Sequence, residues 1–288
     1  MLDGISIPPI FTGLLGADRM VDEMRGQTLD PLMTRTPSRK TLDGKGDWGS
    51  GEMAMKCPNC GSVMDYFSER PRALMCKALT RIRHPRLKSF RPNYAFFEPF
   101  SSGDIVVDVG TGDDPDFSRL MIDRYKCECY GVDPTKKHES ALRRIEEDYK
   151  QFHYLQLALG PENKTVTFYE SKVNVSGSVL VTHRNIVNDP TISYEVEMVT
   201  IDALLNRIGK STIAIIKIDI EGAEFELISS LSANSLNQVD QLIVEFHHGT
   251  VPGYARRDTR AGIKKLEGMG FMSIVYNGRD CLFYKQRP

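Results

Sequence analysis

The chain has 288 residues, of which 41% are hydrophobic and 26% charged, and its formal net charge is −1. A chain of this length can bury one sizeable core with smaller segments attached, and a nearly neutral balance gives no general preference for nucleic acid. No apolar run is long enough to cross a bilayer, and the N-terminus lacks the pattern of a secretory signal. The six cysteines are too scattered for a disulfide framework. We therefore expect a soluble, cytoplasmic protein.

Composition divides the chain into three segments. Residues 1–55 are rich in Gly, Pro, Asp, Arg and Ser without helical or strand periodicity, which predicts either disorder or a start-site extension. Residues 56–100 are basic, and their charges either lie in solvent on short helices or face an anionic partner. Residues 101–288 alternate short apolar runs with helical patterns, which predicts an α/β domain with a mainly parallel, doubly wound sheet.

A pair of cysteines lies in the basic segment. Cys57 and Cys60 have the spacing of half a zinc knuckle, because two thiolates on a tight turn can share one ion. Their candidate partners, Cys76 and His84, stand at an unusual spacing. Free cysteines in a loop are the simpler interpretation, and a zinc site built from these four residues is the alternative.

The first predicted strand, residues 105–109, opens onto Gly110 and Gly112 and then onto Asp113 and Asp114. Glycines in this place let the backbone turn sharply against a ligand. A dinucleotide fingerprint would need a third glycine at position 115, where the chain has proline, and the two carboxylates would repel a pyrophosphate. The pattern favours S-adenosylmethionine, a cofactor with a cationic sulfonium and no phosphate. A buried strand before an acidic helix start is the alternative without a ligand.

A helix over residues 117–125 and a strand over residues 129–133 come next. The strand ends at Asp133, about twenty positions after the glycines, where a carboxylate commonly holds ribose hydroxyls. A helix over residues 136–152 then leads to a strand over residues 154–159. The predicted cofactor contacts are Asp108, Gly110, Gly112, Asp133, Ala158, Leu159 and Asp219.

The middle of the domain carries an insertion with a strand pattern. Strands over residues 166–168, 178–181 and 194–198 are predicted to cover the sheet. Acceptor specificity is expected in this insertion and in the loop 250–260, whose arginines are either solvated or in contact with an acidic substrate group. These arginines are Arg256, Arg257 and Arg260.

A second group of polar residues follows the strands predicted over residues 213–218 and 242–246. Asp219 ends the first of these strands, Glu221 and Glu224 are predicted in the first turn of the next helix, and His247 follows the second strand. Ligands of open sheets lie outside the carboxyl ends of strands, so Asp219 and Glu221 should face the same crevice as the glycines. Glu224 is predicted only to complement the helix dipole.

The last elements close the sheet. A helix is predicted over residues 262–270, and strands over residues 272–276 and 281–284 flank an Asn-Gly pair. Asn-Gly is a strong signal for a two-residue hairpin. The parallel sheet is therefore expected to end in an antiparallel hairpin.

Three motifs together resemble one family. The run Ile216-Lys-Ile-Asp-Ile-Glu-Gly-Ala-Glu224 closely resembles the hallmark of the FkbM-type methyltransferases, and Thr200-Ile-Asp202 and Glu245-Phe-His247 resemble elements before and after it. The first motif departs from the family pattern Asp-Val-Gly-Ala-Asn-x-Gly, since Gly112 is followed here by two aspartates. The similarity covers roughly residues 94–288. The resemblance implies a class I, Rossmann-like fold that uses S-adenosylmethionine, mostly on hydroxyls of sugars or natural products.

Methyl transfer to a hydroxyl needs an aligned acceptor and a group that takes its proton. His247 is the first candidate for that base because an ordinary imidazole titrates near neutral pH, while Asp219 and Glu221 would hold the acceptor or stabilise positive charge. The same three side chains could instead ligate a divalent metal. We predict an O-methyltransferase with a small-molecule or glycan acceptor. The alternatives are an NAD-dependent oxidoreductase and a zinc-stabilised binding module that has lost activity.

Overall fold

The computed structural model describes residues 55–56, 63–64, 84–90, 94–276 and 278–285. All described residues lie in one compact unit, Met53–Pro288. Residues 1–54, and Cys57, Cys60 and Cys76 of the alternative zinc site, lie outside the described residues. The first described elements are two short strands that pair antiparallel, β1 (Met55–Lys56) and β2 (Val63–Met64).

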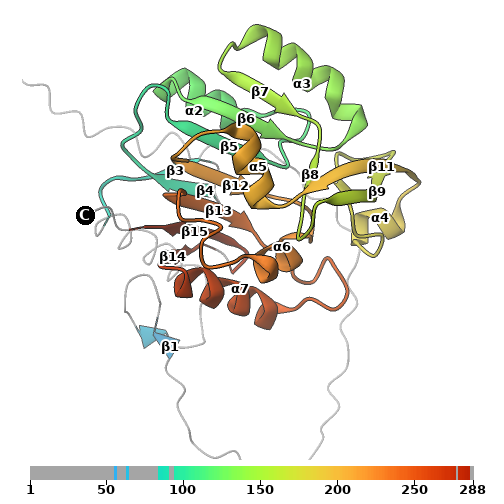
Figure 1. Ribbon diagram of the computed structural model, residues 1–288. Helices are drawn as coiled ribbons and strands as arrows, with labels where there is room; N and C mark the ends of the chain where they lie inside the picture. Colours follow the sequence, from blue (N-terminus) through green and yellow to red (C-terminus); the bar gives the residue numbers. More distant parts are fainter. Residues whose placement is uncertain (1–54, 57–62, 65–83, 91–93, 277, 286–288) are drawn as a thin grey trace, which may run out of the picture. The chain divides into compact units, whose positions relative to one another are not determined.

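A sheet of seven strands, in the order β14-β15-β13-β12-β5-β6-β7, forms the centre of the described domain (Figure 1). The strands from β13 to β7 are parallel, and β15 and β14 extend the β13 edge as an antiparallel hairpin. The strand bounds are β5 (Ile105–Val109), β6 (Glu128–Val132), β7 (Phe152–Leu155), β12 (Ile215–Ile218), β13 (Gln241–Glu245), β14 (Met272–Val275) and β15 (Asp280–Tyr284). This topology confirms the predicted α/β class with a C-terminal antiparallel hairpin.

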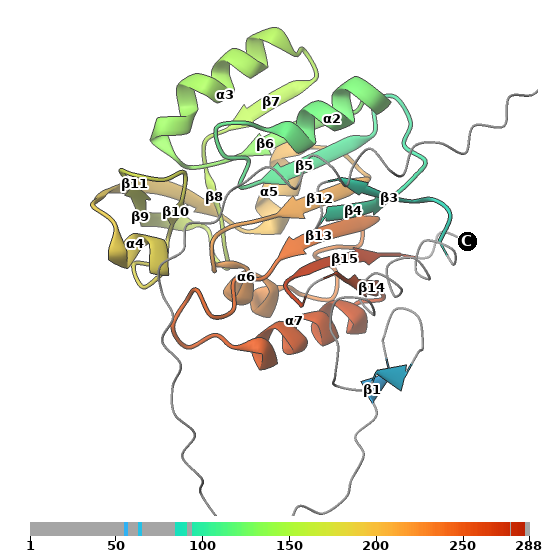
Figure 2. The same cartoon turned by 180° about the vertical axis from the view of Figure 1, so that it is seen from behind.

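Helices cover both faces of the sheet because alternate residues of each strand point to opposite sides (Figure 1 and Figure 2). Val107 and Val109 of β5 pack in one cluster with three helices, and Val106 packs in the other cluster with two helices and a hairpin. The first set is α5 (Ile201–Ile208), α6 (Glu224–Ser230) and α7 (Arg256–Gly268). The second set is α2 (Asp116–Tyr125), α3 (Lys136–Asp148) and the hairpin of β3 (Leu87–Phe90) and β4 (Tyr94–Phe97).

The hairpin of β3 and β4 belongs to this core. Ala95 and Phe96 are each 1% exposed and lie in the same cluster as Phe117 of α2 and Leu282 of β15. The described fold therefore includes residues ahead of position 101, where the sequence analysis starts the methyltransferase domain.

A second sheet follows β7 and has the order β10-β9-β11-β8. Its strands are β8 (Ala158–Leu159), β9 (Lys164–Ser171), β10 (Gly177–Ser178) and β11 (Thr191–Val199), and the short helix α4 (Arg184–Asn188) lies between β10 and β11. The predicted insertion of extra strands is confirmed. The single strand predicted over residues 154–159 is wrong, because the N–H of Leu157 donates to the carbonyl of Leu155 in a tight turn that sends β7 and β8 into different sheets.

The carboxyl ends of β5 and β12 touch. Gly110 follows β5 with a φ of 76°, and a Cβ at this position would lie 1.7 Å from the backbone oxygen of Asp219. A side chain is excluded by this contact and disfavoured by the left-handed backbone. Glycine at position 110 thus places Asp219 directly beside the turn after β5.

Replacing Gly110 by alanine should lower the free energy of unfolding by more than the cost of placing alanine in a left-handed backbone conformation. Gly103 supplies the matched control, since its φ is 82° and a Cβ there would meet nothing within 4 Å. We expect Gly103→Ala to lower the free energy of unfolding by about 1–2 kcal/mol, and Gly110→Ala to lower it by several kcal/mol more because the β12 backbone must move. Urea unfolding of both variants measures the difference. Equal losses would show that the contact is unimportant.

Candidate active site

A cavity of about 280 Å³ opens beyond the carboxyl ends of β5, β6 and β12. The sheet order places β6 on one side of β5 and β12 on the other, and such a switch point is where open α/β sheets bind ligands. Most of the predicted cofactor contacts lie in its wall, namely Gly110, Gly112, Asp133, Ala158, Leu159 and Asp219.

Asp108 does not belong to the cavity lining. Its buried carboxylate accepts a hydrogen bond from Ser118 Oγ at 2.9 Å and pairs with Lys217 Nζ at 3.2 Å. Lys217 Nζ also donates to the carbonyl of Gly110 at 3.2 Å. Burial lowers the pKa of Lys217, but the charges of Asp108 and Asp219 outweigh burial and raise it above its usual value. Asp108 therefore fixes the lysine that holds the glycine turn.

Asp133 is held rigidly at the cavity wall. It is 4% exposed, and its two oxygens accept the backbone N–H groups of Gly112 at 2.9 Å and Thr135 at 2.8 Å. Each oxygen keeps a further lone pair for a ligand hydroxyl. Beside it lies His138, whose two buried ring nitrogens have no hydrogen-bond partner and whose Nδ1 is 3.6 Å from Asp133 Oδ2. An unsatisfied buried imidazole fits a wall that contacts a polar ligand.

Negative charge dominates the cavity lining. Lys217 is the one lysine or arginine in the described wall, against six carboxylates. Such a wall attracts a cation and repels a diphosphate. The acidic residues are Asp113, Asp114, Asp116, Asp133, Asp219 and Glu221.

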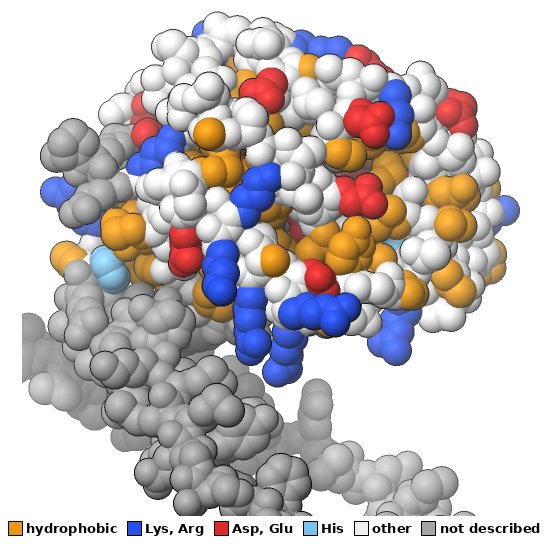
Figure 3. Space-filling view, turned by 60° about the horizontal axis from the view of Figure 1, so that its bottom comes forward, with side chains coloured by type: hydrophobic (Ala, Val, Ile, Leu, Met, Phe, Trp, Pro, Cys, Tyr) orange, Lys and Arg blue, Asp and Glu red, His pale blue; other side chains and the backbone are white. Residues whose placement is uncertain are grey.

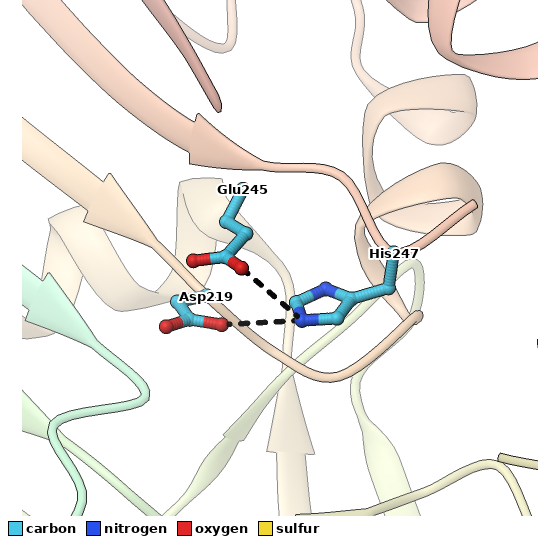
Figure 4. Close-up of side chains that lie close together, drawn as sticks. All are labelled: Asp219, Glu245 and His247. Atoms are coloured by element: carbon cyan, nitrogen blue, oxygen red, sulfur yellow. Dashed lines mark ion pairs between the residues drawn. The ribbon is translucent and has the colours of Figure 1, made fainter. Parts of the chain in front are cut away.

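Asp219, Glu245 and His247 form a cluster at the carboxyl ends of β12 and β13 (Figure 4). His247 Nε2 lies 3.6 Å from Asp219 Oδ1 and 3.9 Å from Glu245 Oε1. On the other side of the carboxylates, the Tyr94 hydroxyl lies 2.7 Å from Glu245 Oε2 and 3.1 Å from Asp219 Oδ2. Burial and the neighbouring carboxylates raise the pKa of Tyr94, and burial raises the pKa of both Asp219 and Glu245.

Glu224 has a larger role than the predicted helix charge. It is fully buried, accepts the N–H of Gly222 at 2.8 Å, and places Oε1 3.3 Å from His247 Nδ1. Burial lowers the pKa of His247, but Glu224, Asp219 and Glu221 outweigh burial and raise it to about 10. The imidazole therefore carries a proton at neutral pH, and it does not line the cavity. The titration near neutrality that favoured His247 as the base does not hold in this surrounding.

Glu221 lies in a turn, because α6 begins only at Glu224 and the expected position in its first turn is wrong. Its φ of 51° is uncommon for a residue with a side chain. Ser176 Oγ and His183 Nε2 each lie 3.0 Å from its carboxylate. Burial raises the pKa of Glu221, but His183 and His247 outweigh burial and hold it below its usual value. This carboxylate is therefore fixed and ionised at the cavity wall.

The structure brings in functional side chains that the sequence analysis does not single out. Tyr94 comes from a hairpin and His183 from the residue before α4, and no motif marks either of them. Glu245 does stand in the Glu-x-His motif, and its place beside His247 gives that motif a physical reason.

The remaining candidates lie away from the cavity lining. Arg256, Arg257 and Arg260 are exposed residues of α7, and Figure 3 brings this side of the domain forward, with Lys and Arg side chains projecting from it. The ring of His84 packs edge-on against Phe97, with the ring centroids 5.5 Å apart.

Among the described helices, none is both long and apolar enough to cross a membrane.

The sequence matches the methyltransferase FkbM domain over residues 108–271. The chain belongs to the FkbM methyltransferase family. This match spans the glycine turn, Asp133 and the cluster around Asp219, and it confirms the resemblance carried by the hallmark motif. The protein is therefore an S-adenosylmethionine-dependent methyltransferase. A search of curated proteins gives no significant match.

Solved structures with some similarity include two fibrillarins. The Methanococcus jannaschii fibrillarin, a pre-rRNA processing protein, is 7% identical, with 78% of each chain covered and a TM-score of 0.40. The Aeropyrum pernix fibrillarin with bound S-adenosyl-L-methionine is 11% identical, with 66% of this chain and 69% of that chain covered and a TM-score of 0.37. The fold assignment rests on the strand order and the family match.

Removing the charge of Asp108 should destabilise the domain, because the buried ammonium of Lys217 then loses its closest carboxylate. Breaking one side of a buried ion pair costs roughly 3–5 kcal/mol. We expect Asp108→Asn to lower the free energy of unfolding by about 3 kcal/mol. Urea unfolding measures this loss of stability, and Asp123→Asn, on the exposed side of α2, is the control. A loss no larger than that of the control would contradict the anchoring role of Asp108.

Proposed function

We propose that this FkbM-family enzyme transfers a methyl group from S-adenosylmethionine to a hydroxyl group of a small molecule or glycan. One observation carries the proposal: Asp219 and Glu221 line the acidic cavity and also belong to the polar group around His247. The wall that suits a cationic methyl donor therefore continues into side chains that suit a hydroxyl acceptor.

The residues of the cavity fit the parts of S-adenosylmethionine, which supplies a methyl group on a positively charged sulfur. Asp133 and the unsatisfied His138 suit the hydroxyls and nitrogens of its nucleoside. Ala158 and Leu159 offer an apolar surface for the adenine ring. The carboxylates of the wall favour the sulfonium over the neutral thioether that remains after transfer, and this preference helps the product leave.

Glu221 is the group that we assign to the acceptor's proton. As the acceptor oxygen bonds to the methyl carbon, the carbon–sulfur bond breaks with its electron pair on sulfur, and the oxygen becomes positive. A positive oxygen gives up its proton readily, so a carboxylate with a lowered pKa is basic enough to take it. Ser176 and His183 hold Glu221 in place, and His247 acts behind Asp219 and Glu221 as a positioning residue.

Calorimetry with the full-length protein tests the choice of cofactor. S-Adenosylmethionine should bind at one site, and NAD should not bind at the same concentrations, because its diphosphate meets the acidic wall. Binding of NAD in place of S-adenosylmethionine would overturn the proposed function and restore the oxidoreductase alternative.

The substitution Asp133→Ala should weaken binding of S-adenosylmethionine. Hydrogen bonds to a charged group contribute about 1.5–3 kcal/mol, which corresponds to roughly 10- to 100-fold in affinity. Isothermal titration calorimetry compares the variant with Asp123→Ala, whose side chain is exposed on α2. Circular dichroism shows whether both variants are folded. An unchanged dissociation constant for folded Asp133→Ala would remove this residue from the cofactor site.

The substitution Glu221→Gln should slow methyl transfer far more than it weakens cofactor binding, because the other five carboxylates of the cavity wall remain. Loss of a general base costs on the order of 100-fold in turnover. The measurement is transfer of a labelled methyl group from S-adenosylmethionine to a small-molecule and glycan extract, followed by mass spectrometry. Glu226→Gln is the matched control, since Glu226 is an exposed residue of α6. Equal turnover of the two variants would exclude Glu221 as the proton acceptor.

A further inference from the structure

We propose that Asp219, Glu245 and His247 bind one divalent transition-metal ion at the edge of the cavity. The three side chains can each offer one ligand atom, and these atoms all lie within 4.8 Å of one another. From the sequence, Asp219, Glu221 and His247 are the alternative metal ligands. The structure replaces Glu221 by Glu245 in this set, because Ser176 and His183 already contact the carboxylate of Glu221.

The orientation of His247 is the first argument. Its side chain is 9% exposed, and the fully buried Glu224 faces Nδ1 at 3.3 Å. A carboxylate at Nδ1 selects the tautomer that carries a proton there, and this outer carboxylate is the usual companion of a metal-binding histidine. With its proton kept on Nδ1 by Glu224, the ring can exchange the proton on Nε2 for an ion that the oxygens of Asp219 and Glu245 also contact.

The distances around Nε2 are the second argument. Nε2 is 3.6 Å from Asp219 Oδ1 and 3.9 Å from Glu245 Oε1, and Glu221 Oε2 is 3.5 Å away. These separations exceed the 2.7–3.2 Å of a good N–H···O hydrogen bond. Ligand atoms that each lie about 2.0–2.2 Å from one ion are roughly 3–4 Å apart, and the distances from Nε2 to Asp219 and to Glu245 lie in that range. The spacing therefore leaves room for an ion between the three side chains in place of the proton on Nε2.

The contacts of Tyr94 are the third argument, because its hydroxyl occupies one oxygen of each carboxylate. Its hydroxyl contacts Glu245 Oε2 and Asp219 Oδ2, and Lys217 Nζ lies on the same side, 3.9 Å from Asp219 Oδ2. The other oxygens, Oε1 and Oδ1, are the ones that face His247. Both carboxylates are thus turned so that one oxygen of each is left for an ion.

The charge of the surroundings is the fourth argument. Five carboxylates gather here against the ammonium of Lys217 and the protonated ring of His247, and Figure 4 shows two of these carboxylates, Asp219 and Glu245, facing His247. Uncompensated negative charge is costly where solvent access is low, and a divalent cation offsets it. The carboxylates are Asp108, Asp219, Glu221, Glu224 and Glu245.

The ligand set indicates the kind of ion. One imidazole with two carboxylates suits Mn²⁺, Fe²⁺ or Zn²⁺ better than Ca²⁺ or Mg²⁺, which prefer oxygen ligands alone. Because Asp219 also lines the cavity, the ion would lie next to the place of the acceptor. Only this role rests on the proposed function: an ion here can bind the acceptor hydroxyl, make it more acidic and orient its oxygen toward the methyl group.

Mn²⁺ is the probe for the test, since it binds carboxylates well and thiolates poorly, so Cys57, Cys60 and Cys76 do not confuse the result. The untagged, full-length protein is treated with a chelator, dialysed and titrated with Mn²⁺ while electron paramagnetic resonance follows the free ion. We expect one ion per chain. The isosteric variants Glu245→Gln and Asp219→Asn should each bind Mn²⁺ on the order of 100-fold more weakly. Glu226→Gln should bind it like the wild type.

The proposal is overturned if the wild type binds no Mn²⁺, or if a folded Glu245→Gln or Asp219→Asn variant binds it as tightly as the wild type. Calorimetry with S-adenosylmethionine on the same samples separates this proposal from the proposed function. Mn²⁺ binding without S-adenosylmethionine binding would leave the metal site standing and overturn the methyltransferase cavity. The reverse result would overturn the metal site alone.

Discussion

The contact between Gly110 and the backbone of Asp219 is the constraint on which the rest of the site depends. It brings the turn after β5, whose Gly112 is bound to Asp133, against the turn after β12 with Asp219 and Glu221, so that both turns border one cavity. Lys217 strengthens this junction, since one ammonium contacts the carbonyl of Gly110 and the carboxylate of Asp108. An in-line methyl transfer needs the two partners aligned within a fraction of an ångström, and a junction of backbone against backbone provides that rigidity.

Several features of the site reduce stability. Glu221 adopts a left-handed backbone, Lys217 and Asp108 are withdrawn from water, and carboxylates crowd around His247. Strained and charged groups of this kind persist where the surrounding structure over-determines them, and they concentrate at functional sites. Here the surrounding structure is a sheet whose central strand is buried on both faces, with five consecutive buried residues in β5. The large apolar core tolerates the local cost of the polar cluster.

Much of this arrangement follows from the sequence, and the exceptions have physical reasons. β5, β12 and β13 are short apolar runs that end in glycine or a carboxylate, and the rule that parallel strands bind ligands at their carboxyl ends places Asp219, Glu221 and His247 together. Tyr94 and His183 come from a hairpin and a loop far away in the chain, and only packing brings them to the cluster. The role of Glu224 was missed because a capping carboxylate and one that orients a histidine look alike in a sequence.

The hairpin of β3 and β4 lies ahead of the segment that matches the family, residues 108–271, yet it supplies the phenol that bridges Asp219 and Glu245. One side of these two carboxylates is therefore covered by a residue from outside the segment 108–271 that matches the family. A change in this preceding hairpin can alter the polarity of the cavity wall without altering any residue of the shared motifs. In this way one methyl-transfer core can diverge toward new acceptors through its upstream neighbour.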